Sequence, residues 1–366
     1  MKYVDEYRDK KHFDALLEAI HKKTTRSWRL MEICGGQTHS IVKYQLDKVL
    51  PQSIELIHGP GCPVCVTPIE TIDTAIALAA NPNVIIASFG DMMRVPGTTD
   101  DLLAAKAKFG NVKMLYSPLD ALTIAEQNPD KEVIFFAIGF ETTAPIHAMT
   151  VEAAKAKGLT NFSILSSLFR VPPAIETIFS DEQCQLDGLL AAGHVCSIMG
   201  TNEYQHLSRK YNIPISITGF EPVDLLYGIL KCIELLEEGN ACVTNAYARA
   251  VLPEGNVKAQ ELLRKTMETC DQSWRGIGTI AMSGMQLNDD YASWDARKKF
   301  GISSETPHLN DACMAGKIMQ GLIKPIQCPL FGTKCTPEHP IGASMVSGEG
   351  ACAAYYRYGQ NNLSNL

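Results

Sequence analysis

Residues 54–65 read IELIHGPGCPVC, a short apolar run that ends in a glycine-rich turn and two cysteines. The run Ile54–Ile57 has the length and composition of a buried strand. The turn Gly59–Gly61 ends this strand, and a helix-like segment, Ile69–Ala80, follows it. A strand, a turn and a helix in this order indicate an α/β fold.

The same order of elements recurs along the chain. Strands are predicted at Leu30–Ile33, Ile54–Ile57, Val84–Ser88, Val112–Tyr116, Val133–Ile138, Phe162–Ser167, Leu186–Ala191 and Ile215–Thr218. Helices are predicted between most of them, for example at Ile69–Ala80, Asp100–Phe109 and Asp120–Gln127. Such alternation is typical of parallel sheets with covering helices.

The distribution of these elements predicts the domains. Four predicted strands precede residue 120 and four follow it, so we expect two similar parallel-sheet α/β domains, 1–122 and 123–230, that face a central cleft. The first domain begins with an amphipathic helix, which carries apolar residues at i, i+3, i+4 and i+7 from Phe13. A long helix is predicted at Leu225–Glu238. The remainder of 231–366 is richer in Cys, Gly and Pro and predicts a third, mostly helical and irregular domain.

Composition narrows the class of protein. Of 366 residues, 46% are hydrophobic and 20% are charged, which is ordinary for a globular chain. The net charge of −7 argues against nucleic acid or an anionic membrane as the main partner. Residues 1–11 are charged and no long apolar run occurs, so we expect neither a secretion signal nor a membrane span, and a cytoplasmic location. In that compartment, clustered cysteines are better read as metal ligands or redox thiols than as structural disulfides.

Polar residues next to glycines follow several of the predicted strands. Parallel α/β sheets bind ligands at the carboxyl ends of their strands. We therefore expect a cofactor in the cleft between the domains, bound by Cys34, Thr38, Glu141, Thr142 and His194.

The segment Cys62–Cys65 is a C-x-x-C motif that follows a strand and opens a helix. Amides at a helix N-terminus favour the thiolate, and Pro63 suits the first helical turn. The pair can form a reversible disulfide or provide two soft metal ligands. The alternative is a buried cysteine pair at a turn. The segment Gly59–Gly61 argues against it, because a plain turn does not need two glycines and a proline before it.

A third thiol, Cys34, follows the first predicted strand and precedes two glycines. Gly35 and Gly36 let the backbone approach a ligand closely. Together with Cys62 and Cys65, Cys34 makes a set of three soft ligands that suits iron, zinc or copper(I) and leaves positions open. His39 is a candidate ligand, orienting group or proton donor, although a structural histidine is an equally good interpretation.

Four further cysteines lie near the C-terminus with the spacing C-x14-C-x6-C-x16-C, namely Cys313, Cys328, Cys335 and Cys352. Four thiolates suit either a structural zinc ion or an iron–sulfur cluster. The absence of a C-x-x-C pair among them favours the cluster modestly. The scattered cysteines, by contrast, read as small buried hydrophobic residues: Cys184, Cys196, Cys232, Cys242 and Cys270.

These motifs together resemble the HypD family of hydrogenase maturation factors over essentially the whole chain. The matching segments are Cys34–His39, His58–Cys65 with Pro68, Phe89–Asp91, Arg94–Gly97, Gly139–Thr143, Gly193–Val195, Gly219–Pro222, Trp274–Gly276, Ser347–Gly350 and the spacing of the last four cysteines. Two positions depart from the family pattern. Leu168 stands where a histidine is frequent, so no role of that histidine carries over, and Cys196 stands where serine is usual.

The resemblance implies a function in assembling the Fe(CN)2(CO) unit of [NiFe]-hydrogenases, together with a HypC-type small chaperone and a HypE-type cyanide donor. It implies that Cys34 holds the iron under assembly and that Cys62 and Cys65 form a redox-active dithiol. It also implies that the four C-terminal cysteines hold a [4Fe-4S] cluster that passes electrons to this dithiol. We expect an assembly scaffold with redox activity, monomeric when alone, rather than a conventional enzyme.

Two alternatives stay open on the sequence. A cluster-linked thiol–disulfide oxidoreductase that acts on a protein disulfide would use the same cluster and the same C-x-x-C pair, but it leaves Cys34 and His39 without a role. A zinc-binding interaction module would be colourless and redox-silent.

Overall fold

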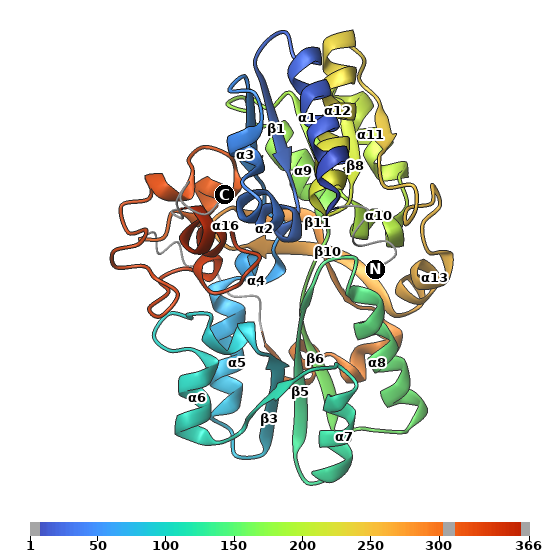
Figure 1. Cartoon of the computed structure of the whole chain (residues 1–366). Coiled ribbons are helices and arrows are strands. Elements are labelled where there is room, and N and C mark those ends of the chain that lie inside the picture. The colour runs from blue at the N-terminus through green and yellow to red at the C-terminus, as the bar shows by residue number, and fades with distance from the viewer. Residues whose placement is uncertain (1–7, 303–311, 360–366) are drawn as a thin grey trace.

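The computed structural model describes residues 8–302 and 312–359, whose strands form two sheets (Figure 1). Sheet A has the order β2-β1-β7-β8-β9 and is parallel throughout. Its strands are β1 (Trp28–Glu32), β2 (Ile54–His58), β7 (Gly188–Ala192), β8 (Ile215–Thr218) and β9 (Val243–Asn245).

Sheet B has the order β10-β11-β6-β5-β3-β4. Its strands are β3 (Val84–Phe89), β4 (Val112–Leu115), β5 (Glu132–Gly139), β6 (Phe162–Phe169), β10 (Met267–Trp274) and β11 (Gly278–Leu287). The first four are parallel, whereas β10 and β11 form an antiparallel hairpin on β6, so sheet B is mixed. The α/β class and all eight predicted strands are confirmed, with strand ends shifted by at most two residues.

Helices surround both sheets (Figure 1). They are α1 (Lys10–Lys23), α2 (Gly35–Lys43), α3 (Leu46–Val49), α4 (Pro63–Val66), α5 (Ile69–Ala79), α6 (Leu102–Phe109), α7 (Asp120–Gln127), α8 (Ala144–Ala156), α9 (Val171–Phe179), α10 (Gly193–Met199), α11 (Asn202–Tyr211), α12 (Pro222–Glu238), α13 (Val257–Thr266), α14 (Ala296–Phe300), α15 (Ala315–Met319) and α16 (Ala351–Ala354). Short 3-10 helices are η2 (Asp91–Arg94), η3 (Asp289–Trp294), η4 (Pro325–Gln327) and η5 (Ala343–Met345), and η6 (Tyr355–Gly359) is a π-helix.

Strand β5 shows why the apolar runs are continuous rather than alternating. Val133, Phe135 and Ala137 pack into one hydrophobic cluster, while Ile134 and Phe136, on the other face, pack into a second. Because helices cover both faces of a parallel sheet, both sides of the strand need apolar side chains. The predicted apolar face of α1 is also observed, because its residues pack with α12 in a further cluster.

The sheets do not follow the predicted domain boundaries. The chain builds β1 and β2 in sheet A, then β3 to β6 in sheet B, and returns for β7 to β9. Each sheet therefore takes strands from both predicted α/β domains, 1–122 and 123–230, and α12 crosses residue 230. Apolar periodicity identifies a strand but not its neighbour in the sheet, which depends on the crossover connections.

The region from residue 231 onward is likewise divided. Strand β9 joins sheet A and the β10–β11 hairpin joins sheet B, so much of the described part of 231–302 belongs to the two sheets and the helices on them. We call residues 312–359 the cysteine unit, which lies beside both halves of the molecule at the left of Figure 1. Within the described residues, no helix is long and apolar enough to cross a membrane.

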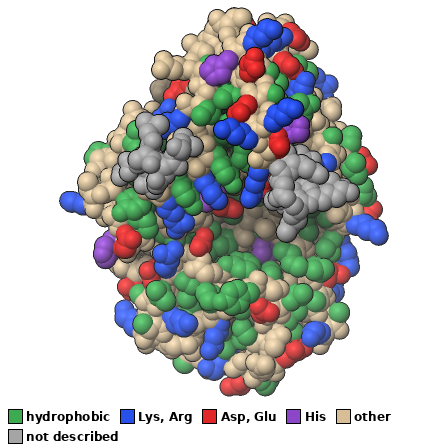
Figure 2. All heavy atoms as spheres, in the orientation of Figure 1, with side chains coloured by type: hydrophobic (Ala, Val, Ile, Leu, Met, Phe, Trp, Pro, Cys, Tyr) green, Lys and Arg blue, Asp and Glu red, His purple; other side chains and the backbone are tan. Residues whose placement is uncertain are grey.

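The strand order of sheet A marks a place for a ligand. The chain leaves β1 towards β2 on one side, and it leaves β7 towards β8 on the other. Loops separate at such a switch point and leave a crevice at the carboxyl ends of the two strands. Figure 2 shows a hollow across the front face between the upper and lower halves of the molecule.

Candidate functional site

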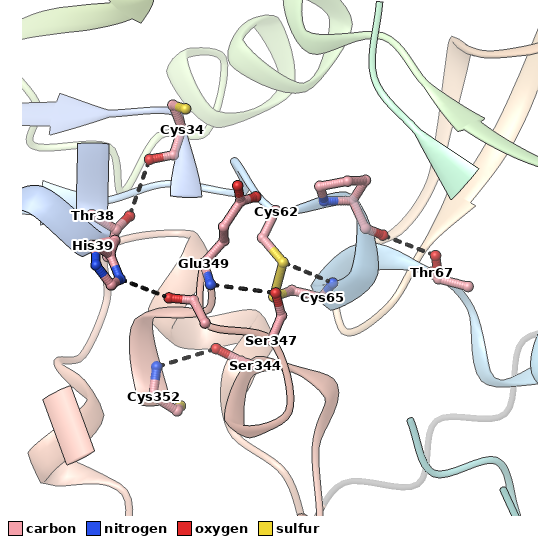
Figure 3. The surroundings of a disulfide bond; sticks show 12 residues. Cys34, Thr38, His39, Cys62, Cys65, Thr67, Ser344, Ser347, Glu349 and Cys352 are labelled. Carbon is pink, nitrogen blue, oxygen red and sulfur yellow. Dashed lines mark hydrogen bonds between the residues drawn. A yellow bond between two sulfur atoms is a disulfide. The ribbon is translucent and has the colours of Figure 1, made fainter. Parts of the chain in front are cut away.

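Cys34 lies at this switch point, directly after β1 and at the start of α2. Its backbone packs against the turn that precedes the C-x-x-C motif. The Gly35 N–H donates a hydrogen bond to the Gly61 carbonyl oxygen at 2.9 Å. A Cβ atom on Gly61 would lie 2.2 Å from the Cys34 nitrogen, so only glycine permits this approach. The two cysteine-bearing turns are thus neighbours in space (Figure 3).

Cys62 and Cys65 form a disulfide at the start of α4. Both are buried, and the Cys62 sulfur accepts a hydrogen bond from the Cys65 N–H at 3.2 Å. Pro63 occupies the first helical turn, as the sequence predicted. The pair is therefore within bonding reach, and Cys34 remains the free thiol of the three.

The side chain beside the Cys34 thiol is His194, at the start of α10 after β7. Its ring nitrogens Nδ1 and Nε2 lie 3.8 and 3.9 Å from the Cys34 sulfur. Burial raises the pKa of the Cys34 thiol far above its ordinary value, while amides at the start of α2 act in the opposite direction. Burial lowers the pKa of His194 to about 4, so both groups are neutral at pH 7.

Thr38 and His39 make contacts away from the Cys34 sulfur. The Thr38 hydroxyl donates to the buried carboxylate of Glu32. His39 Nδ1 lies 3.2 Å from the Gly348 carbonyl oxygen, and its ring meets Tyr358 edge-on at 5.2 Å. Figure 3 shows His39 directed towards the cysteine unit. The histidine in contact with the Cys34 thiol is therefore His194.

Glu349 is a site residue that the sequence reasoning did not single out. Its side chain lies between Cys34 and Cys62 in Figure 3, and burial raises its pKa, with Asp91 as the next cause. A Cβ on Gly35 would lie 2.5 Å from the Glu349 Cβ, so glycine lets the cysteine unit reach α2. The signal for it in the sequence is the segment Ser347–Gly350, which contributes to the family resemblance.

The loop after β5 reaches the same region from sheet B, because Phe140 belongs to one hydrophobic cluster with Cys34 and both bonded cysteines. Glu141 is fully buried, and one carboxyl oxygen accepts from the Val171 N–H at 2.8 Å. In the described part of the chain, its other oxygen and the buried Thr142 hydroxyl have no hydrogen-bond partner. Burial raises the pKa of Glu141 to about 7.

The four C-terminal cysteines line one small, mostly apolar cavity. Cys328 comes from the loop after η4, and the others are Cys313, Cys335 and Cys352. Burial raises the pKa of Cys352 to about 12 and also raises that of Cys313. Among residues 8–302 and 312–359, no three His, Cys, Asp or Glu side chains converge closely enough for a single metal ion. The predicted ligand set is nevertheless brought together around a common space.

A second cavity of about 230 Å³ is lined by both Cys65 and Cys313, with Arg275 in its wall. Arg275 lies in the β10–β11 turn, where its N–H donates to the Val66 carbonyl at 2.8 Å. Its guanidinium donates to the Pro96 carbonyl at 3.0 Å. The hairpin tip therefore places a cation in the wall of the cavity that Cys65 and Cys313 share.

Comparison with known proteins shows the family of this chain. A family model described as "HypD: Hydrogenase formation hypA family" matches residues 11–359. The chain belongs to the HypD family. It is 44% identical to hydrogenase maturation factor HypD2 of Bradyrhizobium diazoefficiens, over 98% of this chain and 97% of that protein. It is 40% identical to hydrogenase maturation factor HypD of Escherichia coli K12, over 98% of this chain and 99% of that protein.

The two departures from the HypD pattern lie inside the protein. Leu168 is fully buried in β6. Cys196 is fully buried on α10, and burial raises the pKa of its thiol well above the ordinary value. This burial agrees with the prediction that Cys196 is a small buried residue.

Proposed function

We propose that this chain takes part in [NiFe]-hydrogenase maturation as a scaffold and redox partner for the Fe(CN)2(CO) unit. In this proposal Cys34 holds the iron under assembly, and a [4Fe-4S] cluster in the cysteine unit supplies electrons to Cys62 and Cys65. The supporting observation is the spatial order of three thiol sites: Cys34, the Cys62–Cys65 disulfide and the cysteine unit. The turn that carries the free Cys34 thiol packs against the turn that leads into the disulfide, and one cavity is lined by both Cys65 and Cys313.

Iron suits the surroundings of Cys34. A soft thiolate is an appropriate ligand for a low-spin iron that carries cyanide and carbonyl. Because burial keeps the thiol protonated, a bound cation has to displace the proton. A Cβ on Gly36 would lie 3.2 Å from the Phe220 ring and 3.6 Å from the Cys34 sulfur, so glycine keeps this space open. The HypC-type chaperone and the HypE-type cyanide donor would act at this opening.

The cysteine unit fits an iron–sulfur cluster. Four thiols line the wall of one cavity, as the ligands of a four-iron cluster do, whereas a zinc ion needs four sulfurs about 2.3 Å from a single point. When bound, the cluster would supply single electrons that originate from an external one-electron donor protein. Opening the Cys62–Cys65 disulfide takes two electrons and two protons and yields two thiols. Glu349, whose pKa is raised by burial, is a candidate donor for one of these protons.

A cluster-linked oxidoreductase would use the same disulfide and the same cluster. It assigns no task to the contact between Cys34 and His194. We therefore rank it second, and the test of Cys34 separates the two proposals.

Infrared spectra of the complex with the chaperone test the assignment. Cys34→Ala should abolish the CN and CO bands and leave the brown cluster intact, because the two sites use different thiols. Cys242→Ala, at a partly buried cysteine outside the site, is the matched control and should keep the bands. His39→Ala should weaken the bands. If Cys34→Ala keeps full bands and Cys65→Ala loses them, the iron anchor is the C-x-x-C motif.

A further inference from the structure

A buried carboxylate holds the backbone of Cys34. Glu32 is the last residue of β1 and is fully buried. One of its oxygens accepts from the Cys34 N–H at 2.9 Å. The other accepts from the Thr38 hydroxyl and lies 2.7 Å from His58 Nδ1. Glu32 thus ties together the start of α2 and the end of β2.

His58 extends this contact towards the end of the chain. Its Nε2 lies 3.1 Å from the Tyr355 hydroxyl, and the two rings meet edge-on at 5.4 Å. A carboxylate only accepts, so His58 Nδ1 donates to Glu32. In the neutral ring Nε2 is then the acceptor, and Tyr355 donates to it. A continuous hydrogen-bond chain runs from Tyr355 through His58 and Glu32 to the amide of Cys34.

Tyr355 belongs to the cysteine unit. It is the residue directly after α16, the helix that carries Cys352, and it is buried. It packs with Val42 of α2, the helix that Cys34 precedes. The hydrogen-bond chain therefore joins the segment with the last of the four cysteines to the helix that carries Cys34.

Each member of this chain is buried, so each depends on its partner. A buried polar group that loses its hydrogen bond bears the full cost of desolvation, and a network of such groups has one sharply preferred arrangement. Removing the Tyr355 hydroxyl leaves the His58 acceptor unpaired and allows the ring to turn away from Glu32. The Cys34 turn would then lose part of its support while both sheets remain intact.

We propose that Glu32, His58 and Tyr355 are positioning residues that couple the filling of the cysteine unit to the geometry of Cys34. A filled unit seats Tyr355, which holds His58 on Glu32 and thereby orients the Cys34 thiol beside His194. An empty unit releases this support. The scaffold thus presents its iron-binding thiol after its own cluster is in place. This inference rests on the proposed function.

The test measures how fast iodoacetamide alkylates Cys34 in the full chain, with the cluster present and after its removal by chelation. In the wild type, removing the cluster should raise the rate about tenfold, because one lost hydrogen bond in the support corresponds to a change of that order. Tyr355→Phe should give the fast rate in both states. Glu32→Gln should do the same, because an amide offers one acceptor oxygen where the carboxylate offers two to its three donors. Its iron and sulfide content should stay at the wild-type level.

Tyr356→Phe is the matched control, because the Tyr356 ring packs on Phe331 within the cysteine unit. It should keep the wild-type difference between the two states. The inference is overturned if Tyr355→Phe retains that difference, or if Tyr356→Phe abolishes it equally. A wild-type chain purified anaerobically without iron and sulfide would overturn the proposed function together with the coupling. Iron and sulfide are therefore measured before the alkylation rates.

Discussion

Replacing Gly61 by alanine should separate the two cysteine-bearing turns. The added Cβ would lie 2.2 Å from the Cys34 nitrogen, 2.3 Å from the Cys34 Cα and 2.5 Å from the Ile33 carbonyl carbon. Cβ atoms essentially never come closer than 3.0 Å to such neighbours, so the backbones have to part by at least 0.8 Å. All three obstacles are backbone atoms, and no change of side-chain rotamer relieves the contact.

The expected effects follow from this displacement. Overpacking of this kind destabilises a protein by about 1–3 kcal/mol. A displacement of this size at a reacting group lowers the rate of the reaction by roughly 100-fold. We therefore expect Gly61→Ala to unfold at lower denaturant concentration and to lose the CN and CO infrared bands. The measurements are equilibrium denaturation and infrared spectra of the complex with the chaperone.

Gly90→Ala is the matched control. Gly90 follows β3, has a helical φ of −55°, and a Cβ there would meet only the Met114 sulfur at 3.4 Å. The same chemical change should therefore be tolerated at this position. Equal stability and equal band intensity in Gly61→Ala and Gly90→Ala would refute the predicted separation of the two turns.

Three further predictions follow from the site. Because burial raises the pKa of Glu141 from 4.5 to about 7, the folded chain binds more protons than the unfolded chain between these values. Stability should therefore fall as pH rises through this window, by up to about 1.4 kcal/mol per pKa unit, and Glu141→Gln should flatten the denaturation profile. Cys335→Ser should remove most cluster iron and sulfide, whereas Cys270→Ser, outside the cavity, should retain them in elemental analysis. Arg275→Gln should lower the reduction potential of the cluster, because a nearby cation stabilises the reduced form. A tenfold change in the one-electron equilibrium constant corresponds to about 59 mV. Arg275→Lys should keep the potential in a redox titration followed by electron paramagnetic resonance, and an unchanged potential in Arg275→Gln would contradict this.

The sequence was sufficient to locate the strands and the thiols. Apolar runs such as Val133–Ile138 are local signals, because a strand covered on both faces needs apolar residues on both. Turns such as Gly59–Gly61 are local as well, since glycine there serves a close backbone approach that the structure shows. The rule that ligands bind at strand carboxyl ends predicted Cys34 and His194 for one site, and the structure brings these two side chains into contact. That they bind a cofactor stays a prediction.

Tertiary structure alone decided which strands pair and which groups meet. The chain returns from sheet B to sheet A, and no local pattern records that crossing. His39 lies five residues after Cys34 but turns towards the cysteine unit, while His194 comes from a distant strand to the thiol. The role of Glu32 is likewise absent from the local sequence. A carboxylate at the end of a strand is usually solvated, and only the fold buries this one against three hydrogen-bond donors. Sequence specifies local conformation and chemistry, whereas contacts between distant segments depend on how the apolar faces pack together.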